Sequence, residues 1–334
     1  MIHPRRPSAV CPASRVIRPQ CASHPSATIR ARRALTPLML ALLAACSARS
    51  AAAEPAGFAF LKIPAGARAA GLGGAYASLA DGVEGAWWNP AALEGAKGGQ
   101  VMASHDEYLA SLRHDEFGVG GRLFGGGVSA SVNALYSEPI PERDALGNLL
   151  GTFGSHDLQF GLGYGRALGS GVRAGASAQV VRERIADASA TTWSVGFGSS
   201  WDPVRITGLR LSADVHDLGP AAHFTVDGAS GQPVALPAAL RLGASLSRPA
   251  GALTVRSALE TSMISGQAGL VMLGAELAHT SGFALRGGLR WGDTESTYAL
   301  GAGWSIKSMR LDYAFVPFKD DLGDTHRFSL GAQF

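Results

Sequence analysis

The sequence predicts an all-β chain that forms a single transmembrane antiparallel β-barrel of about 14 strands, with an N-terminal, partly helical plug. Three observations support this prediction: many segments in which apolar and polar residues alternate, a final alternating segment that ends on Phe334, and a leader of the secretory kind. The composition agrees with it. The 44 Gly and a charged fraction of 16% suit many tight turns and a crowded interior better than they suit a helical soluble enzyme.

Residues 1–53 have the features of a signal peptide. They contain eight Arg and no acidic residue, and an apolar stretch at 35–45 is followed by small residues. Cleavage before Glu54 is one interpretation. Lipidation of Cys46 is the other, because residues 43–46 read Leu-Ala-Ala-Cys, the short pattern that precedes an acylated cysteine. All three cysteines lie in this leader, so residues 54–334 have no disulfide and no Cys-based metal site.

The basic charge of the chain belongs to the leader. The formal net charge is +3, and without the eight Arg of the leader the remaining chain is acidic, so charge gives no support for nucleic-acid binding. The sequence contains no apolar run of the roughly 18 residues that a spanning helix needs. A spanning strand needs only about 9–11 residues with alternate ones apolar, so strands remain as the spanning elements.

From about Gly99 to Phe334 the chain is a series of alternating segments separated by turn signals. One face of these segments is almost entirely Leu, Val, Ala, Phe, Trp and Tyr, and the other mixes Gly and Ser with charged residues. An Arg on the lipid face at mid-bilayer costs roughly 2–4 kcal/mol, so the charged face is predicted to point into the lumen. The predicted lumen-facing charges are Arg210, Asp214, Arg241, Arg256, Glu260, Glu276, Arg286, Arg290, Arg310, Asp312 and Arg327.

The last strand carries the predicted barrel-assembly signal, Phe328, Leu330 and Phe334, on one face. An alternating strand that ends on Phe is typical of bacterial outer-membrane barrels, so the predicted location is the outer membrane. The predicted partners are outer-membrane lipid and the barrel-assembly machinery. A soluble β-sandwich also shows alternation, but the leader, the terminal Phe and the number of strands favour the barrel.

Residues 54–98 are rich in Ala and Gly, have helix-like stretches and lack alternation. The family resemblance given below implies that they form the plug. Asn is a good helix N-cap, and Pro at the first helical position has no N–H to leave unpaired, so a short helix is predicted to begin at Pro90. This turn is interpreted as a structural corner rather than a gate. The plug and gate candidates are Phe58, Phe60, Arg68, Trp87, Trp88, Asn89 and Pro90.

Two motifs suggest chemistry but receive other interpretations. Residues 71–74 (Gly-Leu-Gly-Gly) lack the Lys-Ser/Thr ending of a phosphate loop and are predicted to serve close backbone packing. His-Asp-Glu occurs at 105–107 and again at 114–116. Metal ligands or a protease site at the rim are the functional interpretations, but a solvated turn between the first two strands is predicted. With no Gly-x-Ser-x-Gly elbow in the sequence, no enzyme activity, no metal and no cofactor are predicted.

The plug and the last strands also carry a resemblance to a known family. Residues 60–63 (Phe-Leu-Lys-Ile), 66–75, 87–93 (Trp-Trp-Asn-Pro-Ala-Ala-Leu), 218–243 and 312–330 resemble the PorV/PorQ family, relatives of the FadL-type long-chain fatty-acid transporters. Ala92 stands where the family usually has Gly, and Leu72 where it has Met. The resemblance implies a 14-stranded barrel with an N-terminal plug in the lumen.

Two functions follow as hypotheses. The first is passage of a hydrophobic ligand across the outer membrane, with the plug as a hatch; an apolar pocket formed by Phe58, Phe60, Trp87 and Trp88 would support it. The second, implied by the resemblance, is an accessory role in type IX secretion. Cargo or translocon partners would then bind the longest loops, 137–154 and 218–236.

Overall fold

The computed structural model describes residues 57–334, apart from 294 and 321. The leader, with Cys46, and the predicted cleavage point before Glu54 lie outside the described residues. Among the described residues, none of the helices combines the length and apolar character needed to cross a membrane.

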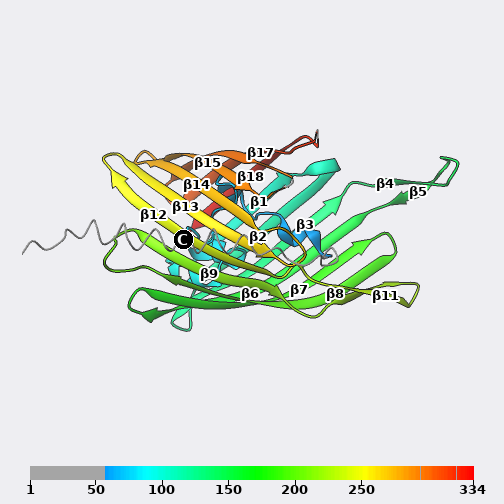
Figure 1. Cartoon of the computed structure of the whole chain (residues 1–334), viewed down its shortest axis with the longest axis horizontal. Coiled ribbons are helices and arrows are strands. Elements are labelled where there is room, and N and C mark those ends of the chain that lie inside the picture. The colour runs from blue at the N-terminus through cyan, green and yellow to red at the C-terminus, as the bar shows by residue number, and fades with distance from the viewer. Residues whose placement is uncertain (1–56, 294, 321) are drawn as a thin grey trace, which may run out of the picture. The chain divides into compact units, whose positions relative to one another are not determined.

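One antiparallel sheet of sixteen strands forms the wall, and fourteen of these strands close into a barrel in the described part of the chain (Figure 1). Sequential strands pair with each other, and the first pairs with the last, from Gln100 opposite Gln333 to Glu107 opposite His326. The predicted fold class is therefore confirmed. The barrel strands are β1 (Gln100–Glu107), β2 (Leu112–Leu123), β3 (Gly126–Ser137), β6 (Ser155–Gly169), β7 (Val172–Ile185), β8 (Ala188–Trp201), β9 (Leu209–Leu218), β12 (Ala239–Ala250), β13 (Leu253–Ile264), β14 (Leu270–His279), β15 (Phe283–Trp291), β16 (Tyr298–Ile306), β17 (Met309–Pro317) and β18 (Asp324–Gln333).

The two ends of the barrel differ in their connections. At one end, which we call the short-turn end, Phe124-Gly125 and Ser170-Gly171 join strands through two residues with positive φ, as in type I′ turns. The opposite end, the long-loop end, carries two hairpins that extend beyond the ring (Figure 1). These hairpins are β4 (Ile140–Arg143) with β5 (Leu149–Phe153) and β10 (Ala222–Val226) with β11 (Ala229–Val234).

The wall is apolar outside and polar inside. On β15, Leu285 is 66% exposed and Leu289 44% exposed, whereas Arg286 between them is only 7% exposed. Inner positions of nearby strands, such as Glu276 of β14 and Asp312 of β17, are each only 1% exposed. This is the opposite of a soluble sandwich, whose apolar faces meet at the core.

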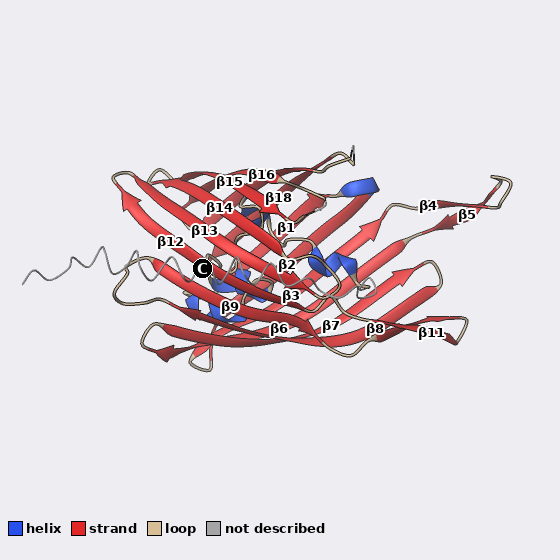
Figure 2. Ribbon diagram, in the orientation of Figure 1, coloured by secondary structure: helices blue, strands red, loops and turns tan. Residues whose placement is uncertain are grey.

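Residues 57–98 fill the bore and form the plug of the predicted fold. Their short helices lie among the wall strands in Figure 2. One of them, η3, contacts β6, β7 and β8, and another, α2, contacts β15 to β18 on the opposite side of the ring. The helices of the plug are η1 (Ala59–Lys62), α2 (Ala67–Gly71), η2 (Gly82–Ala86) and η3 (Pro90–Gly95); η4 (Leu109–Ser111) lies in the loop between β1 and β2.

Candidate functional site

The corner at Asn89-Pro90 fixes the plug to one side of the wall. The Asn89 side chain accepts a hydrogen bond from Ala91 N at 2.9 Å and donates one to Ser199 O of β8 at 3.1 Å. The predicted helix start at Pro90 is confirmed, and the helix is a 3-10 helix. Because one side chain caps the helix and binds the wall, this corner is a fixed point of the plug.

Glycines bring the plug backbone into direct contact with the wall. A Cβ added at Gly71 would lie 3.0 Å from Cα of Gly301, and one at Gly73 would lie 3.1 Å from Cα of Gly288. Gly73 also has a φ of +66°, which other residues rarely adopt. The interpretation of residues 71–74 as a close-packing motif is therefore confirmed.

Arg68 of α2 joins the plug to the wall through a buried carboxylate. Its Nε and Nη2 donate to the two oxygens of Glu276 on β14, both at 3.0 Å. The same carboxylate accepts from Arg286 Nε at 2.6 Å and from Arg256 on the neighbouring strands. A bidentate pair of this kind is among the stronger hydrogen-bonded contacts in proteins.

A second plug carboxylate extends this network. Glu84 of η2 accepts from the hydroxyl of Tyr76 and from Arg310 of β17, and Arg310 Nε also donates to Asp312 at 2.7 Å. Burial acts to raise the pKa of Glu84, but Arg310 and Arg68 outweigh it and hold this pKa below its ordinary value. Glu84 therefore stays ionised inside the plug.

Tyr76 is the neutral member of the same network. Arg68 Nη1 donates to its hydroxyl at 3.0 Å, and burial raises the pKa of this hydroxyl above its ordinary value. The phenol therefore keeps its proton and donates a hydrogen bond to Glu84. We define Arg68, Tyr76, Glu84, Arg256, Glu276, Arg286, Arg310 and Asp312 as the α2 ionic network.

A separate ion pair holds the two tryptophans of the plug. Arg241 of β12 donates to Asp214 of β9 at 2.9 Å and to the carbonyl of Trp88, and its guanidinium lies 5.0 Å from the centre of the Trp88 ring. Nearby, Glu260 of β13 accepts from the plug amide of Ala77 at 2.8 Å.

The other predicted lumen charges lie nearer the barrel ends. Arg210 pairs with Asp202 at 2.7 Å near the short-turn end. Arg290 pairs with Asp293 at 2.6 Å near the long-loop end. Arg327 donates to Pro64 O of the plug at 2.9 Å and lies 3.1 Å from Asp106. The predicted set is thus buried or half-buried, and much of it contacts the plug.

The plug aromatics do not form one pocket. Phe58 and Phe60 pack with Val181, Ala222 and Leu236 near the long-loop end. Trp88 instead packs edge-on against Tyr76, with ring centres 5.5 Å apart. The four aromatics therefore do not form the single pocket that would have supported the hatch hypothesis, because Phe58 and Phe60 belong to η1 and its N-cap, whereas Trp87 and Trp88 lie between η2 and η3.

A small cavity remains between plug and wall beside the tryptophans. Its volume is about 100 Å³, and its lining mixes apolar and polar side chains. The apolar lining includes Ile63, Trp87, Trp88, Ile264 and Met272. Three buried lining atoms, Trp87 Nε1, Asp214 Oδ1 and Glu260 Oε1, have no hydrogen-bond partner within the described chain.

A larger recess opens at the short-turn end, with a volume of about 670 Å³. Its lining is dominated by charged side chains, among them Arg68, Asp81, Glu84, Asp202, Arg210 and Arg310. Members of the α2 ionic network therefore line this recess.

The last strand presents its apolar face outward. Phe328 and Leu330 are 49% and 47% exposed, and the terminal Phe334 is exposed. The backbone of Phe334 exchanges two hydrogen bonds with Gly99, each 2.9 Å long. The predicted assembly signal thus lies on the outer surface of the closing strand.

The two His-Asp-Glu stretches are not a solvated turn, and this prediction is wrong. The turn itself is made by residues 108–111, whereas 105–107 belong to β1 and 114–116 to β2. Asp106, His114 and Glu116 point inward and are buried, and their ligand atoms lie within 4.8 Å of one another. They form a group of the kind that could hold a metal ion, although no metal site was predicted.

Sequence reasoning also missed Tyr76 and Glu84. Both lie in the plug, where no alternation marks the direction of a side chain. The only signal was a single Glu within an otherwise small, apolar stretch, residues 82–86 (Gly-Val-Glu-Gly-Ala).

Comparison with solved structures finds barrels of the same fold. The Pseudomonas putida toluene transporter TodX is 13% identical, with a TM-score of 0.54, over 85% of this chain and 98% of that one. A Pseudomonas aeruginosa FadL homologue is 11% identical (TM-score 0.54; 80% and 98% covered). The CymD monoaromatic hydrocarbon channel is 13% identical (TM-score 0.52; 80% and 97% covered).

Comparison with protein families gives no match, and neither does comparison with curated protein sequences. At these identities the solved structures establish a shared fold. One is named as a transporter and one as a channel, and none of the three is named as an enzyme. The prediction that named the PorV/PorQ family gains no support from them.

Proposed function

We propose that this protein is a bacterial outer-membrane barrel through which small hydrophobic molecules pass, with the plug as a hatch. The observation that supports it best is a closed barrel with an apolar outer wall, whose plug leaves a tryptophan-lined cavity in the bore. The names of the solved structures of like fold, a toluene transporter and a monoaromatic hydrocarbon channel, agree with this proposal.

The outer wall explains the membrane location. Large apolar side chains such as Phe160, Leu162 and Leu285 are more than half exposed, a costly arrangement in water. Turning Arg286 or Arg241 outward instead would cost roughly 2–4 kcal/mol each at mid-bilayer. Since outer-membrane barrels have short periplasmic turns, the short-turn end is assigned to the periplasm.

The cavity argues for a small substrate. Its volume of about 100 Å³ is below the roughly 150 Å³ of an engineered protein cavity that takes up benzene. A single ring is therefore close to the limit, and a long acyl chain would require the plug to move. The unpaired Trp87 N–H and the Asp214 and Glu260 oxygens would favour a ring that carries a polar group.

Binding provides the first test. Toluene and a phenol would be titrated into the purified full-length protein in detergent, with heat of binding as the readout. We expect saturable binding that is weakened by Trp87→Ala. Trp304→Ala on the outer face is the matched control and should bind as the wild type does. Equal binding by both variants would argue against the cavity as the binding site.

The hatch role is tested by locking the plug. A Cβ on Gly120 would lie 3.4 Å from Cβ of Val83, close to disulfide geometry, and residues 54–334 contain no cysteine. Cells that produce Gly120→Cys/Val83→Cys should take up the labelled aromatic only after reduction. Each single variant is a control. If the disulfide-linked variant takes up the aromatic as fast before reduction as after it, the plug is not a hatch. If cells with the wild-type protein take it up no faster than cells without the protein, the barrel is not a channel for it.

The secretion hypothesis remains a prediction. It requires partner proteins to bind the β4–β5 and β10–β11 hairpins, and recovery of a specific partner that is lost when either hairpin is shortened would support it.

A further inference from the structure

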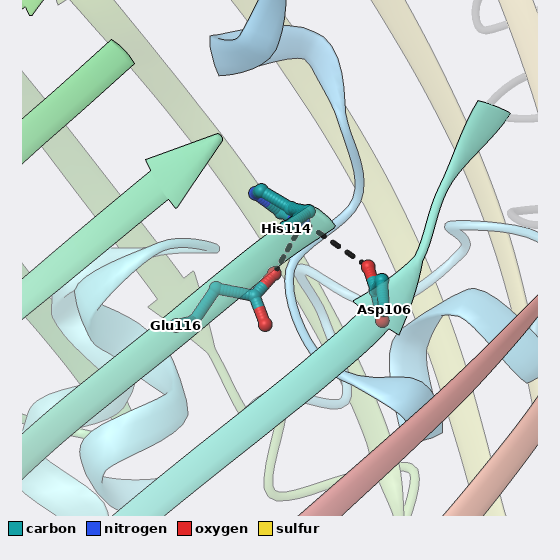
Figure 3. Close-up of side chains that lie close together, drawn as sticks. All are labelled: Asp106, His114 and Glu116. Atoms are coloured by element: carbon teal, nitrogen blue, oxygen red, sulfur yellow. Dashed lines mark hydrogen bonds and ion pairs between the residues drawn. The ribbon is translucent and has the colours of Figure 1, made fainter. Parts of the chain in front are cut away.

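The repeated His-Asp-Glu stretches place three ligand-type side chains together inside the wall. In the register of β1 and β2, Asp106 lies opposite His114, and Ser104 lies opposite Glu116. Side chains alternate between the two faces of a strand. Asp106, the middle residue of the first stretch, therefore lies on the inner face together with His114 and Glu116, the first and last residues of the second stretch. Figure 3 shows Asp106 and Glu116 turned toward His114.

The geometry of this group is tight. His114 Nδ1 lies 3.1 Å from Asp106 Oδ2 and 3.2 Å from Glu116 Oε1, and all three side chains have no exposed surface. A tetrahedral metal with bonds of about 2.0–2.1 Å separates its ligands by roughly 3.3 Å. The two distances from His114 Nδ1 to the carboxylate oxygens are both close to this ligand–ligand separation.

The other ring nitrogen of His114 is already engaged. Nε2 lies 2.6 Å from Asn133 Oδ1 of β3, so the Nε2 proton is donated to this acceptor. Nδ1 then faces the two carboxylates: with a proton it donates to Asp106, and without one its lone pair is available to a metal. A hydrogen bond that fixes the tautomer of a histidine in this way is the usual outer-shell partner of a metal ligand.

Three of the four carboxylate oxygens of Asp106 and Glu116 have no hydrogen-bond donor within the described chain. They are both oxygens of Glu116 and Asp106 Oδ1, and all three are buried. The Ser104 hydroxyl of β1 donates to Phe328 O at 3.1 Å. Arg327 contacts only the other oxygen of Asp106. Buried acceptors that face one another without a donor are costly, and a cation between them removes the cost.

We propose that Asp106, His114 and Glu116 bind a divalent first-row metal ion, preferentially Zn²⁺, inside the barrel wall. One imidazole nitrogen and two carboxylate oxygens suit Zn²⁺ and its neighbours better than Mg²⁺ or Ca²⁺, which prefer oxygen ligands alone. Arg327 offsets part of the negative charge, and it also binds Pro64 O, so the metal site lies next to the plug. The site does not depend on the transport proposal.

The chain supplies its own control on the outer side of the same strands. His105 lies 2.6 Å from Asp115 and 3.4 Å from Glu107, but these side chains are 40% to 59% exposed. His105, Glu107 and Asp115 thus have the same residue types as the proposed metal ligands, but they are exposed instead of buried. Their substitution should leave the metal content unchanged.

The test measures metal bound to the purified full-length barrel. The protein would be stripped with a chelator and dialysed against Zn²⁺, and the bound metal would be counted by mass spectrometry, with Mg²⁺ as the comparison ion. We expect one Zn²⁺ per chain for the wild type and for His105→Gln/Asp115→Asn. Glu116→Gln and His114→Gln should lose it. Asn133→Leu, which keeps all three ligands, should weaken binding about 10- to 100-fold.

Folding is followed in parallel, because a buried substitution can prevent it. Each variant must show the electrophoretic shift of a closed barrel before its metal content is counted. In the wild type, Zn²⁺ should raise the unfolding temperature, and in Glu116→Gln it should not. A folded wild type that binds no more Zn²⁺ than folded Glu116→Gln would overturn the proposal. The three residues would then interact only through hydrogen bonds and protons shared among them.

Discussion

The plug meets the wall in two different ways on opposite sides of the bore. On the β6–β8 side, η3 lies directly on glycines: a Cβ on Gly175 would lie 2.3 Å from the Pro90 backbone, and one on Gly165 would lie equally close to it. On the β13–β17 side, α2 also lies on glycines, but the α2 ionic network adds buried charges between plug and wall.

The two contacts differ in what holds them: close backbone packing at η3, and buried ionised groups in addition to it at α2. The η3 contact depends mainly on the absence of side chains and on the Asn89 hydrogen bonds, which do not respond to pH or ions. Its one described ion pair, between Glu94 and Arg122 of β2, is at the surface, since the Arg122 side chain is 46% exposed. The α2 contact depends on Arg68, Glu84 and Glu276 remaining ionised. If the plug moves during passage, we expect it to hinge at η3 and to release at α2, next to the recess at the short-turn end.

The largest effect is expected from Glu276→Gln. This carboxylate is shared by Arg68, Arg256 and Arg286, so its loss removes a common partner from one buried and two half-buried guanidinium groups. Removing one partner of a buried ion pair typically destabilises by about 3–5 kcal/mol. Urea unfolding in vesicles measures the change, and faster proteolysis of the plug should accompany it.

Exposed Glu107→Gln is the matched control for that substitution and should change the unfolding free energy by less than about 1 kcal/mol. If Glu276→Gln behaves like Glu107→Gln, the α2 ionic network does not hold the plug.

The next effect is expected from Gly175→Val on the η3 side. The new side chain would collide with Pro90, whose ring limits how the turn can adjust. Overpacking of this kind costs about 1–3 kcal/mol. Ala176→Val, one residue along on the exposed face, is the control and should be neutral in the same unfolding measurement. Equal stability of the two variants would show that η3 does not rest on this strand.

A smaller effect is expected from Asn89→Ala, which removes the cap of η3. Loss of a cap costs about 0.5–2 kcal/mol. Asn89→Asp keeps the acceptor for Ala91 N but loses the donor to Ser199 O, so it separates the cap from the wall contact. Thermal unfolding of the three proteins should place Asn89→Asp between the other two. An Asn89→Ala protein as stable as the wild type would show that the cap is dispensable.

The smallest effect is expected from pH. The pKa of Glu84 is held below its ordinary value of 4.5, so its stabilising contribution is complete above pH 4.5 and is lost as the pH falls through the lowered value. Proteolysis of the plug should therefore accelerate in acid, and Glu84→Gln should flatten this dependence. Acceleration that is unchanged in Glu84→Gln would assign the pH response to another group.

The alternation of residues along the sequence by itself determined the strands of the wall. Period-two patterns such as Leu285, Arg286, Leu289 and Arg290 on β15 depend only on strand geometry, so they revealed the strands and their faces. Turn signals separated the strands well enough to predict about fourteen. Asn89-Pro90 predicted its helix start because capping is a local property.

Only the tertiary structure decided which groups meet. The partner of Glu276 is Arg68, 208 residues away, and nothing local in either segment encodes that contact. Asp106, His114 and Glu116 converge because the register of β1 against β2 sets Asp106 opposite His114, and a shift by one residue would turn the set outward. Local sequence thus specifies elements and faces, whereas register and closure of the ring specify the sites.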